Sequence, residues 1–361
     1  MEKHFVGLDV HKEHINMAVV DSQGKIVKEA KFLNNMQALD HFLGGMEQGT
    51  EFALEACGFY EPIYDWIDDR NYNVTLCHPL KVKAIASAKI KTDVIDARTI
   101  AQLKRVDLLP ESYVPPKHVR EVRSIVRHRA SMVRQRAHIK HCVHAVLHRE
   151  GIKQPFSDLF GKAGIEYLKK VPVKYSNRLA IDNYLAIYHA MTEKIELTSI
   201  QIEGLVNANP NVNRLTSLPG IGAYSALLIA TEIGDIHRFP NAKKLCSYAG
   251  LVPSVYQSAR TLRMGHITKE GNKLLRWILV EAAQKASEHD PHLSKLYYRM
   301  KPRLGRNKAV VAIARKILCY VYIMLTKGKS YTCIETINQG NKKPVHARVS
   351  HVPLSQTCTT V

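Results

Sequence analysis

The chain has 361 residues, 45% of them hydrophobic, and a formal net charge of +20 at pH 7. This length allows two or three domains, each with a core, and the apolar content excludes a mostly disordered chain. Seven cysteines without a CxxC pair argue against a disulfide framework or a zinc ribbon. The chain does not open with a charged segment followed by an apolar one, as a secretory leader would. Its most apolar late stretch is interrupted by Arg315 and Lys316. We therefore expect a cytosolic protein that does not span a membrane.

The charge is unevenly distributed along the chain. Residues 1–110 carry a net charge of −3, whereas residues 111–361 carry +23. So large a surplus is typical of a polyanion-binding region, because each phosphate neutralised by Lys or Arg releases a condensed counterion. An anionic membrane surface is the competing partner. It is disfavoured because no basic amphipathic stretch carries a bulky aromatic face.

Residues 1–110 predict an α/β domain. Three short strands joined by tight turns open it, with Val6, Leu8 and Val10 alternating along the first. Helical and strand patterns then alternate through "EFALEAC" and "NVTLCHP" to "DVIDARTIAQLK", giving the order βββαβαβα. Alternating βα units require parallel strands with crossover helices, so we expect a mixed sheet of about five strands. This is the architecture of the RNase H-like (RuvC-like) nucleases.

A Pro-rich break, "DLLPESYVPPKH", precedes a region that we predict to be a basic helical arm over residues 115–208. Residues 117–150 have helical apolar spacing and many cations, and they would form a helix roughly 50 Å long. A second helical stretch carries Leu185, Tyr188, Ile195 and Ile202 on a heptad-like seam, so the two helices should pair as an antiparallel coiled coil. The arginines of the first helix that we expect to contact nucleic acid are Arg123, Arg127 and Arg134.

Residues 212–330 predict a mainly helical third domain, and residues 331–361 a weakly ordered tail. The domain opens with "LPGIG", which resembles the turn of a helix-hairpin-helix module. There Gly220 and Gly222 would let backbone N–H groups approach a phosphate. The simpler alternative is an ordinary turn between helices. The basic composition of this domain favours contact with a DNA backbone.

Four acids are the candidate catalytic residues. Asp9 interrupts the first strand, Glu55 lies near the end of a second strand, and Asp93 and Asp96 share one face of a later helix. Ligands of open α/β sheets gather at the carboxyl ends of strands. Four carboxylates there would suit Mg²⁺, and two such ions can clamp a phosphodiester exchange. Each acid alone could equally be a surface charge, a helix cap or a salt-bridge partner of Lys89 or Arg98.

The stretch between "GLVP" and "ITKEGN" has no helical period, so we expect Ser254, Tyr256 and Ser258 on a loop. A serine among arginines could attack phosphorus and form a phosphoserine intermediate, with Tyr256 as a rival nucleophile. Most loop serines, however, only form turns or donate hydrogen bonds to phosphate. The surrounding cations, expected to bind nucleic acid, are Arg260, Arg263, Lys269, Lys273 and Arg276.

Together these motifs resemble the DEDD recombinases (transposases) of the bacterial insertion-sequence family one-hundred-ten. The resemblance runs in order through "GLDVHK", "LEACG", "KTDVIDA", "LPGIG", "YAGLVP" and "ITKEGNKLLR", nearly the whole chain. It implies a RuvC-like domain in which Asp9, Glu55, Asp93 and Asp96 bind Mg²⁺, as a pair of ions. It also implies that Ser258 is the nucleophile of a C-terminal transposase domain, although Ala259 replaces the glycine usual in the family.

The resemblance further implies DNA as substrate and a structured non-coding guide RNA as partner. Recombination of two DNAs requires at least a homodimer, and a homotetramer is also compatible. Two alternatives remain. One is a junction-resolving nuclease that uses metal-activated water and leaves Ser258 structural. The other is a non-catalytic nucleic-acid-binding scaffold with a degenerate nuclease fold.

Overall fold

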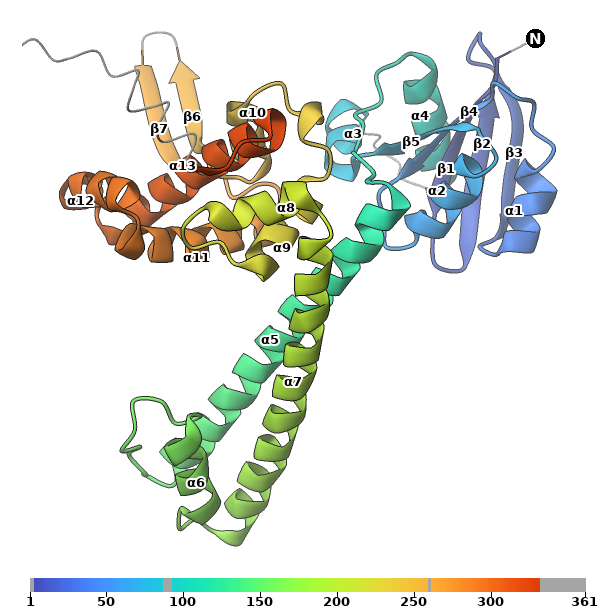
Figure 1. The fold of residues 1–361 in the computed structure, drawn as a ribbon. Helices are drawn as coiled ribbons and strands as arrows, with labels where there is room; N and C mark the ends of the chain where they lie inside the picture. The colour runs from blue at the N-terminus through green and yellow to red at the C-terminus, as the bar shows by residue number, and fades with distance from the viewer. Residues whose placement is uncertain (1–2, 87–92, 259–260, 332–361) are drawn as a thin grey trace, which may run out of the picture. The chain divides into compact units, whose positions relative to one another are not determined.

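The computed structural model describes residues 3–86, 93–258 and 261–331. The chain divides into two compact units, Met1–Val114 and Pro115–Val361. The first unit is α/β and the second is mainly helical (Figure 1). The predicted combination of an α/β part with helical parts is therefore confirmed. The predicted weakly ordered tail lies, from residue 332 onward, outside the described residues.

The first unit contains one five-stranded mixed sheet in the strand order β3-β2-β1-β4-β5. Strands β1, β2 and β3 pair antiparallel, whereas β1, β4 and β5 pair parallel, as the sequence predicts. Its elements are β1 Phe5–Val10, β2 His14–Val20, β3 Ile26–Leu33, α1 Met36–Leu43, β4 Glu51–Glu55, α2 Tyr60–Asp68, β5 Asn73–Cys77, α3 Pro79–Ile85 and α4 Asp93–Arg105.

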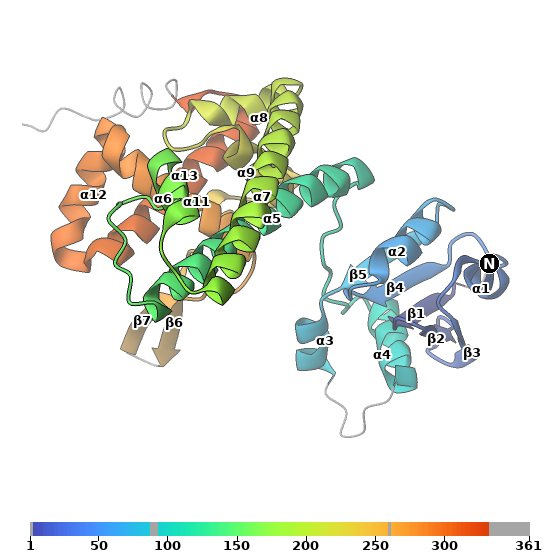
Figure 2. The same ribbon diagram turned by 90° about the horizontal axis from the view of Figure 1, so that it is seen from below.

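Alternation along β1 decides which helices cover each face of the sheet. Val6 and Leu8 belong to the core formed with α1 and α2. On the other face Gly7 meets α4 so closely that a Cβ there would lie 2.1 Å from the carbonyl oxygen of Ala97. Figure 2 shows α1 and α2 on one side of the sheet and α4 on the other. Asp9 has the same parity as Gly7, so the fold directs this acid toward α4.

The α/β unit extends slightly beyond the predicted end at residue 110. The N–H of His78 donates to the carbonyl oxygen of Pro110, and the N–H of Ser112 donates to that of Leu76. This segment therefore lies along the edge of β5, and Val114 packs against the core of the sheet. The covered edge also reduces exposure of unpaired strand groups.

The second unit begins with two long antiparallel helices, α5 (Lys117–Arg149) and α7 (Tyr175–Asn207), which lie side by side in Figure 1. Arg129 Nε donates to Ser199 Oγ at 2.8 Å, and near the middle of the arm Arg136 faces Thr192. The predicted seam faces inward, because Leu185, Ile195 and Ile202 are buried and Tyr188 is partly buried. Helix α6 (Lys162–Lys170) packs at the outer end of the arm, where it forms a small separate core with the ends of α5 and α7.

The remaining elements form a helical domain whose largest core is shared by α9, α11 and α13. Helix α13 is long and apolar enough to cross a membrane by length and composition, but its apolar residues belong to this core. That burial favours a core helix. The elements are α8 Pro210–Arg214, the 3₁₀ turns Leu215–Ser217 and Ile236–Arg238, α9 Ala223–Ile233, α10 Ala242–Tyr248, β6 Pro253–Ser258, β7 Thr261–Ile267, α11 Lys273–His289, α12 Pro291–Leu304 and α13 Arg306–Lys327.

The expected loop around Ser254, Tyr256 and Ser258 is instead a β-hairpin. Strands β6 and β7 pair antiparallel, with Ser258 opposite Thr261. The expectation was wrong because the absence of a helical period was taken as the absence of any regular structure. Strand-favouring residues were present, since β6 contains Val255 and Tyr256 and β7 contains Thr261 and Ile267. Much of the hairpin is exposed, with Tyr256 at 69% exposure, so its sequence lacks the apolar alternation of a half-buried strand.

Candidate active site

Asp9 is a buried carboxylate near the carboxyl end of β1. Its residue is only 8% exposed, and its backbone lies opposite Asn16 on β2. Burial raises the pKa of the Asp9 carboxyl above its ordinary value, and the negative charges of Asp93 and Asp96 raise it further, while His11 acts in the opposite direction. A buried acid made less acidic by like charges is a feature of functional sites.

Glu55 ends β4, the parallel neighbour of β1, and therefore lies at the same edge of the sheet as Asp9. The pKa of the Cys57 thiol depends on the charges of both acids. Its pKa is raised first by burial and then by the charges of Glu55 and Asp9, so both carboxylates lie near this thiol. Parallel pairing thus brings together two acids that are 46 residues apart in the sequence.

Asp93 and Asp96 lie in the first turn of α4, where negative side chains favour the positive end of the helix dipole. Asp96 and Glu55 line one cavity of about 220 Å³ between α3 and α4. Arg98, a possible salt-bridge partner of these acids, pairs instead with Glu29. The four predicted acids are therefore gathered at one edge of the sheet. The charges of Asp93 and Asp96 act on the pKa of Asp9, and Glu55 lines a cavity together with Asp96.

His11, in the β1–β2 turn, and His14, the first residue of β2, also belong to this site. Neither residue was predicted to have a role. His11 Nε2 lies 3.0 Å from Asp9 Oδ2 and 3.6 Å from Asp93 Oδ2. His14 Nε2 also lies 3.6 Å from Asp93 Oδ2. The signal was available in "GLDVHKEH", where both imidazoles follow the acid closely across a short turn.

The donor set suits a divalent cation. Carboxylate oxygens are the preferred ligands of hard divalent ions. The pKa of Asp9 is raised by burial and then by the charges of Asp93 and Asp96, and a cation between these acids would relieve both effects. Asp9, Glu55, Asp93 and Asp96 are the residues that would hold it. Their role as metal ligands stays a prediction.

The predicted nucleophile lies in the second unit. Ser258 is the last residue of β6, while its side chain, Ala259 and Arg260 lie outside what the structure describes. Arg263, Lys269 and Lys273 are exposed, as a nucleic-acid-binding role requires. Arg276 is half-buried and its Nη1 donates to the carbonyl oxygen of Ala249 at 3.0 Å, so this side chain also supports the fold.

The glycines of "LPGIG" differ in what they require. Gly220 has φ of +83°, and a Cβ there would lie 2.4 Å from the carbonyl oxygen of Ala282 on α11. Close packing of the turn on α11 therefore explains this glycine without a ligand. Gly222 caps α9 with φ of −90° and has open space where a Cβ would be. Contact of either glycine with phosphate stays a prediction.

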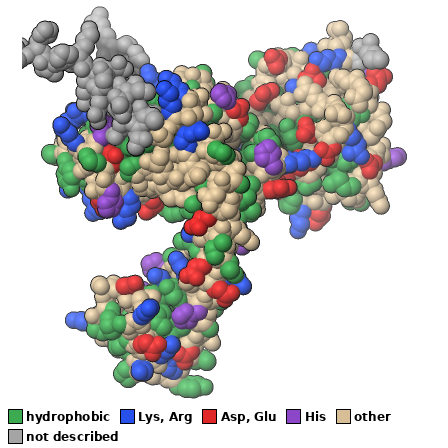
Figure 3. Space-filling view, in the orientation of Figure 1, with side chains coloured by type: hydrophobic (Ala, Val, Ile, Leu, Met, Phe, Trp, Pro, Cys, Tyr) green, Lys and Arg blue, Asp and Glu red, His purple; other side chains and the backbone are tan. Residues whose placement is uncertain are grey.

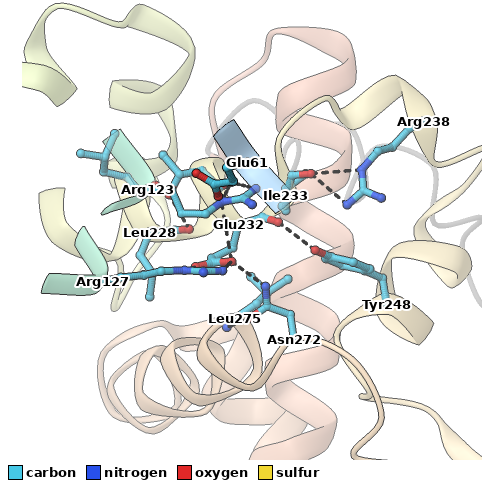
Figure 4. A network of polar contacts seen from close by, with 12 residues as sticks. Glu61, Arg123, Arg127, Leu228, Glu232, Ile233, Arg238, Tyr248, Asn272 and Leu275 are labelled. Carbon is cyan, nitrogen blue, oxygen red and sulfur yellow. Dashed lines mark hydrogen bonds and ion pairs between the residues drawn. The ribbon is translucent and has the colours of Figure 1, made fainter. Parts of the chain in front are cut away.

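Two of the three predicted arm arginines hold the arm to the helical domain (Figure 4). Arg127 forms two hydrogen bonds with the fully buried Glu232, at 2.7 and 2.8 Å, and Arg123 Nε donates to the carbonyl oxygen of Thr231 at 2.9 Å. Asn272 Nδ2 donates to Glu232 Oε2 at 2.6 Å. These contacts give Arg123 and Arg127 a structural role, whereas Arg134 is exposed. Contact of all three with nucleic acid stays a prediction.

Burial by itself would raise the pKa of Glu232, but hydrogen bonds from Arg127 and Asn272 and the charges of Arg127 and Arg123 outweigh it. The pKa of this carboxyl therefore lies below its ordinary value. Glu232 is ionised and fully partnered at neutral pH. Its role is to join α5, α9 and the start of α11.

A five-stranded mixed sheet that carries clustered acids at its carboxyl edge, in a chain that continues into helical parts, is consistent with a DEDD-type RNase H-like domain. Such a domain indicates dependence on a divalent metal. The class defined by the fold and the site is therefore that of metal-dependent enzymes acting on phosphodiesters.

Comparison with known proteins identifies the family. Residues 6–151 match a family model of DEDD transposases, and residues 212–298 match that of the transposase IS116/IS110/IS902 family. The chain belongs to this family of transposases, and it is an enzyme of DNA recombination. The two matches together cover more than half of the chain.

Curated relatives are similar over almost the full length. The transposase for insertion sequence element IS1111A of Coxiella burnetii is 24% identical, with 91% of each chain covered. The transposase for element IS1328 of Yersinia enterocolitica is 24% identical over 91% of this chain and 98% of its own. The pilin gene-inverting protein of Moraxella bovis is 26% identical over 92% of this chain and 98% of its own.

Proposed function

We propose that this transposase cuts and exchanges DNA strands in a Mg²⁺-dependent reaction that passes through a covalent phosphoserine at Ser258. The observation that carries the proposal is the gathering of Asp9, Glu55, Asp93 and Asp96, from three separate segments, at one edge of the sheet. Mg²⁺, when bound there, would polarise the scissile phosphate and stabilise the charge that develops on its oxygens.

In the proposed step, the Oγ of Ser258 forms a bond to phosphorus while the bond from phosphorus to the leaving strand's oxygen breaks. The hydroxyl proton passes to a base, and the departing oxygen takes up a proton. The terminal hydroxyl of another strand then attacks the phosphoserine, which releases Ser258 and joins the new pair of strands. No phosphodiester bond is lost over the cycle. The acids hold the cation and orient the phosphate at its scissile bond.

Basic residues supply the binding surface in this proposal. Six cations of α12 and the start of α13 are exposed, and Figure 3 shows Lys and Arg side chains over this domain, including its outer end around α12. They are Lys295, Arg299, Lys301, Arg303, Arg306 and Lys308. A DNA backbone and a structured guide RNA present the same phosphates, and the net charge of +23 over residues 111–361 supports a polyanion partner. Two DNAs must be brought together, so we propose a homodimer or homotetramer.

The name of one relative, the pilin gene-inverting protein, agrees with strand exchange rather than simple cutting. Site-specific inversion needs each broken end to be kept and rejoined. A covalent protein–DNA intermediate meets that need because it conserves the phosphodiester energy. A water-dependent nuclease does not, since hydrolysis releases free ends.

The test is a covalent-adduct assay with the full chain, labelled donor DNA and RNA that copurifies with the protein. We expect the wild type to form a denaturant-stable protein–DNA adduct in Mg²⁺. Ser258→Ala should abolish the adduct and strand joining while nucleic-acid binding persists. Ser254→Ala is the matched control on the same strand and should retain the adduct.

Three other outcomes would overturn the proposal. Cleavage retained by Ser258→Ala without an adduct would indicate a nuclease that uses water. An adduct lost only in Tyr256→Phe would transfer the nucleophile to the tyrosine, which is 69% exposed. Strand joining retained after Asp9→Ala and Asp93→Ala would remove the acids from the mechanism.

A further inference from the structure

The imidazoles of His11 and His14, together with Asp93, form a compact cluster at the proposed active site. The ligand atoms of the three residues all lie within 4.8 Å of one another. The two rings stack, with centroids 4.9 Å apart and planes inclined by 21°. Stacking leaves both Nε2 atoms facing the same carboxylate oxygen, each at 3.6 Å.

Backbone hydrogen bonds hold this arrangement in place. The N–H of His11 donates to the carbonyl oxygen of His14 at 2.9 Å, which closes the β1–β2 turn. Asn34 Nδ2 donates to the carbonyl oxygen of His11 at 2.8 Å, which fixes the turn to the end of β3. The imidazoles therefore project from a turn whose backbone is held by hydrogen bonds.

Two of the three separations are close to those of ligands around one small cation. Zinc lies about 2.0–2.1 Å from imidazole nitrogen and carboxylate oxygen, so two ligands at the tetrahedral angle are roughly 3.3 Å apart. The observed 3.6 Å between each Nε2 and Asp93 Oδ2 is close to this value and too long for a hydrogen bond. Asp9 Oδ2 lies 3.0 Å from the same Nε2 atom of His11, so an ion bound by this nitrogen would replace its hydrogen bond with Asp9.

His14 supplies an independent observation. Its Nε2 atom is shielded from solvent and has no hydrogen-bond partner among the described residues. A buried polar atom without a partner costs roughly 1–3 kcal/mol, and native proteins rarely tolerate one without a reason. A cation between His14 and Asp93 would satisfy this nitrogen.

We propose that His11, His14 and Asp93 form a binding site for a borderline divalent transition-metal ion of the Zn²⁺ or Co²⁺ class. Imidazole ligands favour such ions, whereas Mg²⁺ prefers oxygen ligands and water. Asp93 also belongs to the proposed Mg²⁺ site, so any effect of this ion on catalysis rests on the proposed function. An ion at this site competes for Asp93, so Zn²⁺ would inhibit the Mg²⁺-dependent reaction.

The test uses Co²⁺ as a spectroscopic probe on the full chain after removal of metals with EDTA. Mixed nitrogen and oxygen coordination with four or five ligands gives much stronger visible absorption than octahedral oxygen coordination. We expect one equivalent of Co²⁺ to produce these bands, Zn²⁺ to abolish them, and a large excess of Mg²⁺ to leave them.

His11→Gln and His14→Gln should each weaken Co²⁺ binding by at least about 10-fold, because each removes a direct ligand. Gln keeps a polar side chain of similar size, so the hairpin should stay folded, which circular dichroism checks. The matched control is His141→Gln, an exposed histidine of α5, which should leave the spectrum unchanged. Retention of full Co²⁺ affinity in both hairpin variants would overturn the inference, as would equal loss in the control.

This readout separates failure of the inference from failure of the proposed function. If the histidines bind no ion, the Co²⁺ spectrum is insensitive to them while the phosphoserine adduct still forms in Mg²⁺. If the proposed function is wrong, Ser258→Ala or Asp9→Ala leaves strand joining intact, whatever the Co²⁺ spectrum shows.

Discussion

Two buried carboxylates, one in each unit, show how the same chemical group serves opposite purposes. Asp9 is 8% exposed and Glu232 is fully buried. Asp9 lies among other acids and its pKa is raised, chiefly by burial, whereas two arginines and an asparagine lower the pKa of Glu232 despite its burial. Glu232 is partnered by cations and an amide, whereas Asp9 has, in the part of the chain that the structure describes, the single imidazole of His11 as its hydrogen-bond partner and lies beside two further acids. We propose that Asp9 binds a cation from outside the chain, which is how a functional site would differ from a structural ion pair.

The difference between the two carboxylates is tested most directly by replacing each of them with an isosteric amide. Asp9→Asn should lower the rate of strand joining on the order of 10³-fold, because it removes a carboxylate from the charge-stabilising site. Its free energy of unfolding should not fall, since the lost charge was buried among like charges. Adduct formation and urea unfolding measure the two quantities. A large loss of stability without loss of activity would reverse the roles assigned here.

Glu232→Gln should give the opposite result. We expect a loss of about 3 kcal/mol in the free energy of unfolding, because Arg127 and Arg123 would face an uncharged, poorly matched partner. Urea unfolding of the full chain, followed by circular dichroism, measures it. An unfolding free energy within about 0.5 kcal/mol of the wild type would show that the network contributes little.

The effect of pH sharpens the same point. The pKa of Glu232 in the folded state is below its unfolded value, so its contribution to stability is present above the unfolded pKa and is lost as the pH falls. The difference in unfolding free energy between the wild type and Glu232→Gln should therefore be largest near pH 7. It should shrink once the pH falls below about 4.5, the ordinary value for the group. A difference that is constant from pH 7 to pH 3 would contradict this account.

The two glycines of "LPGIG" offer a smaller, matched test. Gly220→Ala should lower the free energy of unfolding by about 1–3 kcal/mol, because the new Cβ meets the Ala282 carbonyl oxygen at a positive φ. Gly222→Ala should cost less than about 1 kcal/mol, since nothing lies within 4 Å of the added atom. If Gly222→Ala weakens DNA binding with little change in stability, the phosphate role predicted for this turn gains direct support. Equal stability losses would refute the packing explanation.

The smallest expected effect concerns the exposed arm arginine. Arg134→Ala should leave stability within about 0.5 kcal/mol of the wild type and reduce the salt dependence of nucleic-acid binding by about one unit of slope. Arg127→Ala is its counterpart on the same helix and should be destabilising, because it removes two hydrogen bonds to Glu232. Binding measured over a range of salt concentrations, with parallel thermal unfolding, distinguishes them. Destabilisation by Arg134→Ala would show that this residue too is structural.

Features with a local period were determined by the sequence itself. The alternation in β1, the βα repeats and the apolar spacing of residues 117–150 predicted the mixed sheet and the long helix, because strand and helix periods are properties of neighbouring residues. Chain order also predicted that Asp9 and Glu55 would share an edge of the sheet, since parallel neighbouring strands end together.

Only the tertiary structure decided the long-range pairings. Arg127 and Glu232 are 105 residues apart, and no spacing rule joins them, so an arginine that was predicted to contact DNA proved to be paired with a buried carboxylate. The β6–β7 hairpin escaped prediction because its exposed strands lack the apolar alternation that burial imposes on a sequence. The pairing of His11 and His14 with Asp93 likewise depends on how the β1–β2 turn meets the start of α4. Periodicity records which face a residue occupies, whereas the partner it meets is set by how those faces pack in three dimensions.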